Sequence, residues 1–396
     1  MTPSVYVIAG EPSGDQLGGH LLAGLKAETG ARDLRMRGIG GEMMAAEGLS
    51  SLFPMSDLSV MGLTEVLPRL PLLLRRVREA AEDVIAARPD VLITIDSPDF
   101  CLRVAKRVKR ALPDLKTVHY VAPSVWAWRP GRADKMARVI DHVLALLPFE
   151  PPYMQAAGMS CDFVGHPVAR LPVATVADAA RFRDAHGIGV DTPLLCLLPG
   201  SRRGEIALQG PVFRDAVGLV QQAMPDLAVV IPAAGPVADD VAAVFAAQSP
   251  APIILDPRGI DPDKAQESKF AAFAASDLAL ASSGTVSLEL ARQGTPMVIG
   301  YQMKPLSRWL MKRLVRLDTA TLVNIVTETR AVPEYLFDDF RPAPIAAEIA
   351  RLLTDSDSNA AQRRAGQDSM ALLGAGDIDP GRRAAQSVLR FLAATS

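Results

Sequence analysis

Residues 5–15 read VYVIAGEPSGD, and residues 194–205 read LLCLLPGSRRGE. Each stretch joins a short apolar run to a turn with glycine and serine, which predicts a buried strand, a loop and then a helix. Such a loop presents backbone N–H groups and the positive end of a helix, and this arrangement suits anions. Because one unit opens each half of the chain, we expect two similar α/β domains. Their loops differ, so the two halves should do different jobs.

Outside these two units, short apolar runs alternate with helical stretches. Near-continuous apolar strands between helices are typical of parallel, doubly wound sheets. The expected strands are 5–9, 34–38, 91–95, 117–121, 142–146 and 162–164 in the first half, and 194–198, 228–231, 253–255, 278–281 and 297–299 in the second. The predicted fold class is α/β, with two Rossmann-like, doubly wound domains that face each other across a cleft and a helical C-terminal tail.

The expected linker is residues 165–192, which contain two prolines. We therefore expect one domain over residues 1–170 and a second over residues 171–396. Ligands should bind in the cleft, at the carboxyl ends of the strands. Periodicity leaves open whether the last helix crosses back onto the first domain.

The composition excludes several classes of protein. Of the 396 residues 49% are hydrophobic, which is ample for two cores, and a net charge of −2 gives no reason to expect nucleic acid as a partner. Three scattered cysteines argue against a disulfide framework or a zinc site and fit a reducing cytoplasm. We expect neither a secretory signal nor a bilayer-spanning segment.

The loop after the first strand carries two carboxylates. Gly10 and Gly14 allow a tight turn, while Ser13 can donate a hydrogen bond. Glu11 and Asp15 suit sugar hydroxyls better than phosphates, because like charges repel. A plain turn with Asp15 as helix cap explains the pattern equally well. The pattern G-x-G-x-x-G is missing, which disfavours a dinucleotide-dependent dehydrogenase.

Two further loops of the first half follow strands. Asp96 comes at the end of the run 91–95, where a carboxylate can act as a general base or bind a hydroxyl, and we favour such a role over helix capping. For Asp99 we favour capping. The loop with Ser124 and Trp126 holds two of the three tryptophans; it suits a sugar or acyl surface, and a packed interface loop explains it equally well.

The second half offers two phosphate-binding loops. Arg202 follows a glycine turn and can bind a diphosphate through two hydrogen bonds. Because the turn comes directly after a buried strand, we favour this role over that of a surface arginine without function. Ser283, Gly284 and Thr285 open a helix, and Glu289 one turn later can accept ribose hydroxyls. A plain helix start, capped at Thr285, is the alternative. Acidic triplets at 261–263, 355–357 and 377–379 read as solvated loops or helix ends, so no metal is implied.

Residues 67–78 read LPRLPLLLRRVR and interleave leucines with arginines. The leucines spread over more than one helical face, which favours a segment in an anionic membrane interface over an ordinary core helix with a basic side. The expected contacts are Leu67, Leu70, Leu72, Leu73, Leu74, Arg75 and Arg76.

Nearly the whole chain resembles the lipid-A-disaccharide synthase family. The resemblance rests on AGEPSGD (9–15), VMGLTEVL (60–67), IDSPDF (95–100), HYVAPSVWAWR (119–129), LLPFE (146–150), FVGHP (163–167), LPGSRRGE (198–205), SSGTVSLE (282–289) and GYQMKP (300–305). Pro12 departs from the family pattern, which has a small residue there, but this removes no functional side chain.

The resemblance implies a GT-B glycosyltransferase that is inverting and independent of metals and cofactors. UDP-2,3-diacylglucosamine would be the donor and 2,3-diacylglucosamine 1-phosphate the acceptor, giving a β-1′,6-linked disaccharide 1-phosphate and UDP. The reaction would take place at the cytoplasmic face of the inner membrane, with the protein peripheral to it. A homodimer stays an open expectation.

Residue roles follow from the matched motifs. Asp96 would be the base, and Arg202 would stabilise the leaving diphosphate. UDP would lie on Gly200, Ser201, Arg202, Glu205, Ser283, Gly284, Thr285 and Glu289. The acceptor would lie on Glu11, Ser13, Gly14, Asp15, Asp99, Ser124 and Trp126. Two alternatives remain: a UDP-N-acetylglucosamine 2-epimerase on the same architecture, and a non-catalytic, membrane-associated nucleotide-binding protein.

Overall fold

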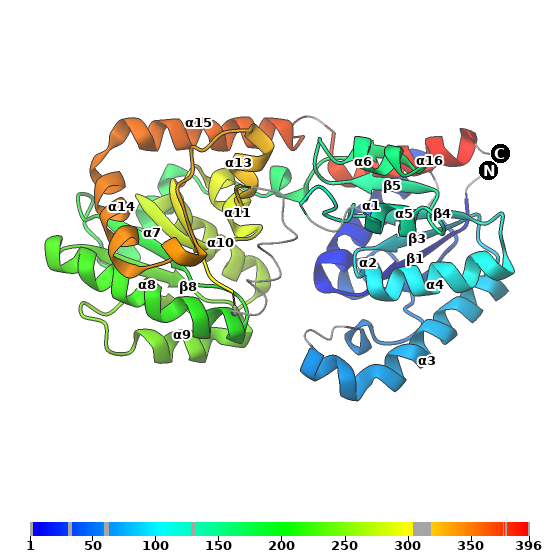
Figure 1. Cartoon of the computed structure of the whole chain (residues 1–396), viewed down its shortest axis with the longest axis horizontal. Helices are drawn as coiled ribbons and strands as arrows, with labels where there is room; N and C mark the ends of the chain where they lie inside the picture. Colours follow the sequence, from blue (N-terminus) through cyan, green and yellow to red (C-terminus); the bar gives the residue numbers. More distant parts are fainter. Residues whose placement is uncertain are drawn as a thin grey trace. The chain divides into compact units, whose positions relative to one another are not determined.

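The structure is a computed structural model that describes residues 3–30, 34–58, 63–127, 131–303, 318–374, 376 and 378–394; of residues 63–68 only the backbone is described. The chain forms two compact units. The first contains Met1–Arg170 and Leu373–Ser396, and the second contains Leu171–Leu372. Within the described residues each unit is built on one six-stranded sheet (Figure 1).

The sheet of the first unit is parallel throughout. Its strands are β1 Val5–Ala9, β2 Met36–Ile39, β3 Val91–Ile95, β4 Lys116–Tyr120, β5 His142–Ala145 and β6 Ser160–Phe163, in the spatial order β2-β1-β3-β4-β5-β6. Its helices are α1 Pro12–Thr29, α2 Glu42–Ala46, α3 Leu63–Ala87, α4 Pro98–Ala111, α5 Gly131–Met136, α6 Pro151–Ala156 and α16 Pro380–Ala394. The α/β class is confirmed. The second and sixth strands begin two residues away from the expected positions, because pairing with neighbours fixes strand ends.

Both faces of this sheet are buried. Successive side chains of a strand point to opposite faces, so the apolar run of β1 supplies two cores. Tyr6 and Ile8 lie in the core that includes side chains of α3 and α4. Val5 and Val7 lie in the core that includes side chains of α1 and α16.

The last helix, α16, packs on α1 in the first unit. Two glycines make the close approach: a Cβ on Gly24 would lie 2.7 Å from the carbonyl oxygen of Gly381, and a Cβ on Gly381 would lie 2.6 Å from that of His20. The expected second domain, 171–396, is therefore too long, because Leu373–Ser396 belongs to the first unit. Periodicity shows which face a helix buries but not which sheet receives it.

The second unit repeats the architecture. Its strands are β7 Leu194–Leu198, β8 Ala228–Pro232, β9 Ile253–Leu255, β10 Leu278–Ser282, β11 Met297–Tyr301 and β12 Glu334–Leu336, in the spatial order β12-β11-β10-β7-β8-β9. Its helices are α7 Val176–Ala185, α8 Arg203–Ala223, α9 Ala238–Phe245, α10 Pro262–Ala275, α11 Val286–Gln293, α13 Leu322–Thr327, α14 Pro342–Thr354 and α15 Ser356–Leu372. Short 3₁₀ turns lie at Met55–Asp57, Pro167–Arg170, Gly235–Val237 and Phe337–Asp339.

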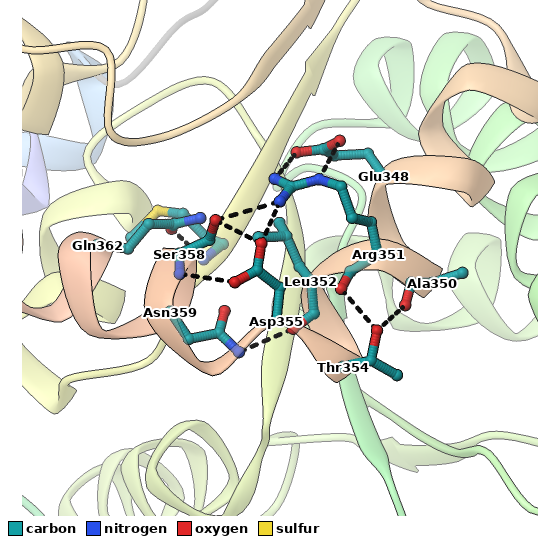
Figure 2. Close-up of polar contacts among 10 residues, drawn as sticks. Glu348, Ala350, Arg351, Leu352, Thr354, Asp355, Ser358, Asn359 and Gln362 are labelled. Carbon is teal, nitrogen blue, oxygen red and sulfur yellow. Dashed lines mark hydrogen bonds and ion pairs between the residues drawn. The ribbon is translucent and has the colours of Figure 1, made fainter.

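Acidic residues mark helix starts in the C-terminal part of the chain. At the junction of α14 and α15, the Asp355 carboxylate accepts hydrogen bonds from the backbone N–H of Ser358 (2.9 Å) and from Arg351 Nη1 (2.5 Å) (Figure 2). Asp261 and Asp379 likewise accept backbone N–H groups at the starts of α10 and α16. These three members of the acidic triplets therefore lie at helix ends, as expected.

The strand order reverses once in each sheet. In the first sheet, β2 and β3 lie on opposite sides of β1; in the second, β8 and β10 lie on opposite sides of β7. Doubly wound sheets bind ligands where the strand order reverses, at the carboxyl ends of the strands. The loops at these points are those that begin at residues 10 and 96 in the first unit and at residues 199 and 283 in the second.

Candidate active site

The loops after β1 and β3 touch each other in the first unit. A Cβ on Gly10 would lie 2.5 Å from Ser97 Oγ, so a larger residue would displace Ser97. One turn into α1, a Cβ on Gly14 would lie at an ordinary distance, 3.5 Å, from the carbonyl oxygen of Ile95. The structure thus brings together the two loops that the sequence analysis assigns to the acceptor.

The backbone turns sharply at Asp96. Asp96 and Ser97 both have left-handed backbone angles, with φ of 49° and 41°. Such angles cost residues other than glycine on the order of 1–3 kcal/mol each and cluster at functional sites. The Asp96 N–H donates to the Tyr120 carbonyl oxygen at 3.0 Å, which anchors the turn to β4. Asp96 is half-buried at the reversal point of the first sheet.

Asp15 has a structural task that differs from the expected contact with the acceptor. It is 4% exposed, and its carboxylate accepts hydrogen bonds from the backbone N–H groups of Gly41 (2.7 Å), Met43 (2.9 Å) and Met44 (3.1 Å). These groups are at the start of α2, so Asp15 caps that helix rather than its own.

The other predicted acceptor residues near these loops are more open. Glu11 occupies the N-cap position of α1 and is half-buried, and Pro12 follows at the first helical position, which favours proline. Ser13 is exposed in the first turn of α1. Asp99 is exposed in the first turn of α4, where its charge suits the helix dipole, but the N-cap position that we favoured for it is occupied by Ser97.

The side chain of Trp126 forms a hydrogen bond with a buried carboxylate. Its indole N–H donates to Glu150 Oε1 at 3.2 Å, and its ring meets Phe149 edge-on at 5.1 Å. Glu150 is 3% exposed, and burial raises the pKa of its carboxyl to about 7, although hydrogen bonds from the Leu147 N–H and Trp126 oppose this. Ser124 is exposed in the same loop.

Sequence reasoning did not single out Glu150 or His119 as individual residues, although both lie in quoted motifs. The buried His119 ring nitrogen Nδ1 lies 2.8 Å from Thr94 Oγ1, two residues before Asp96. Burial lowers the pKa of His119 to about 4, with help from Arg132, so the ring is neutral at pH 7. The presence of these two residues in the motifs LLPFE and HYVAPSVWAWR was the available signal.

In the second unit, Glu205 shapes the loop after β7. The Ser201 N–H donates to Glu205 Oε2 at 2.9 Å, and Arg202 Nη1 lies 3.4 Å from Glu205 Oε1. A Cβ on Gly200, which has φ of 134°, would lie 2.6 Å from Glu205 Cβ. Arg202 itself is 62% exposed in its side chain. The loop therefore leaves most of the guanidinium open to an anion while Glu205 fixes its backbone.

The loop after β10 leads into the N-terminus of α11. Ser283 Oγ donates to the carbonyl oxygen of Ala320 at 3.1 Å, and Ser287 Oγ donates to that of Gly284 at 2.9 Å. Gly284 and Thr285 are exposed. This geometry orients the helix start toward solvent, and the positive end of the dipole is available to a phosphate.

Glu289 forms an ion pair with Lys269, a lysine that the sequence analysis did not single out. Lys269 Nζ on α10 lies 2.5 Å from Glu289 Oε2 and 5.5 Å from the ring centre of Phe273. Neither side chain is more than 35% exposed. A ribose that binds Glu289 would share the carboxylate with Lys269.

Helix α3 carries the predicted membrane contacts. Leu70 and Leu74 are 41% and 44% exposed, and Arg75 is exposed, whereas Leu72 and Leu73 are half-buried. Arg76 differs from the expectation, because it lies 2.6 Å from both Asp57 and Glu79 and stacks on Phe53. Of the residues quoted from the sequence, Val60, Met61, Gly62, Trp128, Arg129, Lys304, Pro305, Asp377 and the side chain of Leu67 lie outside the described residues.

Two doubly wound units with polar loops at their reversal points are the architecture of the GT-B class. Among solved structures, the UDP-N-acetylglucosamine 2-epimerase of Neisseria meningitidis bound to UDP-GlcNAc matches with a TM-score of 0.61 at 9% identity, over 99% of both chains. The calicheamicin glycosyltransferase CalG4 matches with a TM-score of 0.57 at 18% identity, also over 99% of both chains. These likenesses concern the fold alone.

Sequence comparison gives the family. The family model for lipid-A-disaccharide synthetase matches residues 5–386. The lipid-A-disaccharide synthase of Ruegeria pomeroyi is 57% identical over 385 residues, covering 97% of this chain and 94% of the relative. That of Rhodospirillum centenum is 46% identical, covering 98% and 94%. The chain belongs to the lipid-A-disaccharide synthetase family, and it is a glycosyltransferase of lipid A biosynthesis. The epimerase alternative is not favoured.

Among the described helices, none is both long enough and apolar enough to cross a bilayer.

Proposed function

We propose that this enzyme transfers 2,3-diacylglucosamine from UDP to the 6-hydroxyl of 2,3-diacylglucosamine 1-phosphate. The products are the β-1′,6-linked tetraacyl disaccharide 1-phosphate and UDP. Membership of the family supports the reaction class. The observation that carries the proposal is the strained turn at Asp96, which presents a carboxylate at the reversal point of the first sheet.

Asp96 acts as the general base. The transfer inverts the anomeric carbon in one displacement, so a base must take the proton of the acceptor hydroxyl as the new bond forms. A carboxylate suits this task when it reaches the substrate from a rigid element. The left-handed turn and the bond to the Tyr120 carbonyl oxygen hold Asp96 in that position.

Arg202 and the α11 N-terminus stabilise the departing UDP. Negative charge grows on the diphosphate as the bond to the sugar breaks, and fixed donors in that region lower the barrier. Glu205 positions the loop through the Ser201 N–H, and Gly200, Ser283, Gly284 and Thr285 complete the donor site. Glu289, which forms an ion pair with Lys269, accepts hydrogen bonds from the ribose hydroxyls.

The acceptor binds on the first unit. Glu11 and Ser13 offer hydrogen bonds in the loop that touches the Asp96 turn, and Gly14 and Asp15 shape that loop. Ser124 and Trp126 offer a hydroxyl and an aromatic face in the loop after β4, the strand next to β3. The Glu150 contact fixes the angle of the Trp126 ring.

Both substrates carry acyl chains, so the enzyme works as a peripheral protein at the cytoplasmic face of the inner membrane. The exposed leucines of α3 support this proposal, since such side chains insert into the acyl region of an interface. Serine at positions 70 and 74 should lower vesicle binding. Equal binding of that variant and the wild type would argue against α3 as the contact.

One incubation tests the reaction itself. The purified enzyme is mixed with the two acylated sugars in detergent micelles, and the products are analysed by mass spectrometry. A disaccharide 1-phosphate together with UDP supports the proposal. A second incubation, with UDP-N-acetylglucosamine alone, tests the epimerase alternative. The proposal is overturned if this second incubation forms the 2-epimer while the first incubation forms no disaccharide.

A further inference from the structure

Helix α4 bears a row of cations on its exposed face. Arg103, Lys106, Arg107 and Arg110 are spaced at i, i+3, i+4 and i+7, which places them on one side of the helix, and all four are exposed. Within the described part of the chain, none of them lies within 4.0 Å of a carboxylate. Lys109, by contrast, pairs with Asp141 at 2.8 Å.

Like charges at this spacing repel one another and disfavour the helix. Elsewhere on the molecule arginines are commonly paired, as Arg258 is with Asp239 and Asp256. A row of four cations that has no carboxylate partner among the described residues therefore destabilises the helix locally, and an external anion can relieve this repulsion. We call the set Arg103, Lys106, Arg107 and Arg110 the α4 cation row.

The α4 cation row borders apolar side chains of α3. Helices α3 and α4 pack against each other (Figure 1). The four cations and two α3 residues, Leu74 and Val77, line a surface groove of about 250 Å³. Leu70 lies one turn before Leu74, and both leucines are more than 40% exposed. Cationic and aliphatic side chains thus share one continuous surface.

We propose that this surface binds the phosphates of anionic phospholipids in a bilayer, with the α4 cation row on the headgroups and Leu70 and Leu74 directed to the acyl layer. The pairing of exposed leucines with cations is what an anionic interface recognises. A soluble phosphate would use the cations but not the leucines. The inference deepens the proposed function and rests on its membrane association, because it adds the cations of α4 to the α3 segment that the sequence analysis expects in an anionic interface.

The test measures binding of the full-length enzyme to phosphatidylcholine vesicles with and without phosphatidylglycerol. The variant R103Q/K106Q/R107Q/R110Q removes the row. A charge-matched control, K264Q/R341Q/R363Q/R364Q, removes four exposed cations of the second unit. The row variant should lose about a hundredfold or more in affinity for the anionic vesicles, since each of the four cations contributes roughly a fivefold factor and the factors multiply. The control should bind like the wild type.

Equal binding of the row variant and the wild type would overturn the proposal, and so would an equal loss in both variants. Inorganic phosphate distinguishes a soluble ligand: at matched ionic strength it should compete no better than sodium chloride. Stronger competition by phosphate would mean a soluble-anion site instead. A thermal unfolding midpoint at or above that of the wild type shows that the row variant is folded, because repulsion has been removed.

Activity in detergent micelles separates this inference from the proposed function. The α4 cation row lies outside the loops at the reversal point, so the row variant should form disaccharide in neutral micelles at the wild-type rate. If the wild-type enzyme forms no disaccharide, the proposed reaction is wrong, and the vesicle-binding result alone then decides the lipid-surface inference. A row variant that is inactive in micelles would assign the cations to substrate binding and overturn the lipid-surface inference.

Discussion

At the scale of single residues, the turn at Asp96 and Ser97 stores backbone strain beside the proposed base. Replacing Ser97 by glycine relieves one left-handed residue, so the free energy of unfolding should rise by about 1 kcal/mol. The disaccharide-forming rate should fall, because a freer turn holds Asp96 less firmly. Chemical denaturation and a product assay measure the two effects.

Glu328 provides the matched control for Ser97→Gly. It is exposed at the C-cap of α13 with φ of 53°, far from the reversal-point loops in sequence. Glu328→Gly should stabilise the protein similarly and leave the rate unchanged. If Ser97→Gly destabilises the enzyme, or leaves its rate at the wild-type value, the turn does not position the base.

Glu150 gives a pH dependence with a defined sign. Its pKa is raised from 4.5 to about 7, so between these values the unfolded chain has released a proton that the folded enzyme still holds. Wild-type stability should therefore fall, relative to Glu150→Gln, as the pH rises from 4.5 to 7, by up to about 3 kcal/mol. Urea unfolding at a series of pH values measures the difference. A difference that does not change with pH would contradict the raised pKa.

At the scale of elements, Asp15 joins α1 to α2. Asp15→Asn keeps the shape but weakens three charge-assisted bonds to backbone N–H groups, so the free energy of unfolding should fall by about 1–3 kcal/mol. The KM for the acceptor should change by no more than a few-fold. A large rise in this KM at unchanged stability would restore the direct contact with the acceptor that the sequence analysis expects.

The elements also show why part of the site was predictable. A strand, a glycine turn and a helix are encoded within about a dozen residues, so the loops at Gly10, Asp96, Gly200 and Ser283 could be located from local pattern. The partners of these loops come from afar: Asp15 caps a helix that begins at residue 42, and Trp126 depends on Glu150. Such contacts form only when the sheet assembles, and a single sequence carries no local trace of them.

At the scale of the whole molecule, the chain returns to its first unit through α16. Local sequence pattern could not predict that α16 packs on the first unit. The helix has an ordinary apolar stripe, but the two glycines that allow its close packing, Gly24 and Gly381, are 357 residues apart in sequence (381 minus 24). The two parallel sheets themselves were foreseen, because buried parallel strands are apolar throughout.

Gly381→Val tests the packing of α16. The new side chain would meet the His20 backbone at under 3 Å, so the free energy of unfolding should fall by about 1–3 kcal/mol. Gly376→Ala is the control, since its Cβ would meet no atom of the described residues within 4 Å. Thermal unfolding compares the variants. Equal midpoints for both would show that α16 does not rely on this glycine contact.

The central claim is that Asp96 takes the proton of the acceptor hydroxyl. The most direct measurement is the single-turnover rate of disaccharide 1-phosphate formation by Asp96→Asn, with exposed Asp114→Asn as control. Loss of a general base predicts a fall of about 10²–10⁴-fold for Asp96→Asn at unchanged stability, and a wild-type rate for Asp114→Asn. A rate for Asp96→Asn within a few-fold of the wild type would contradict the account.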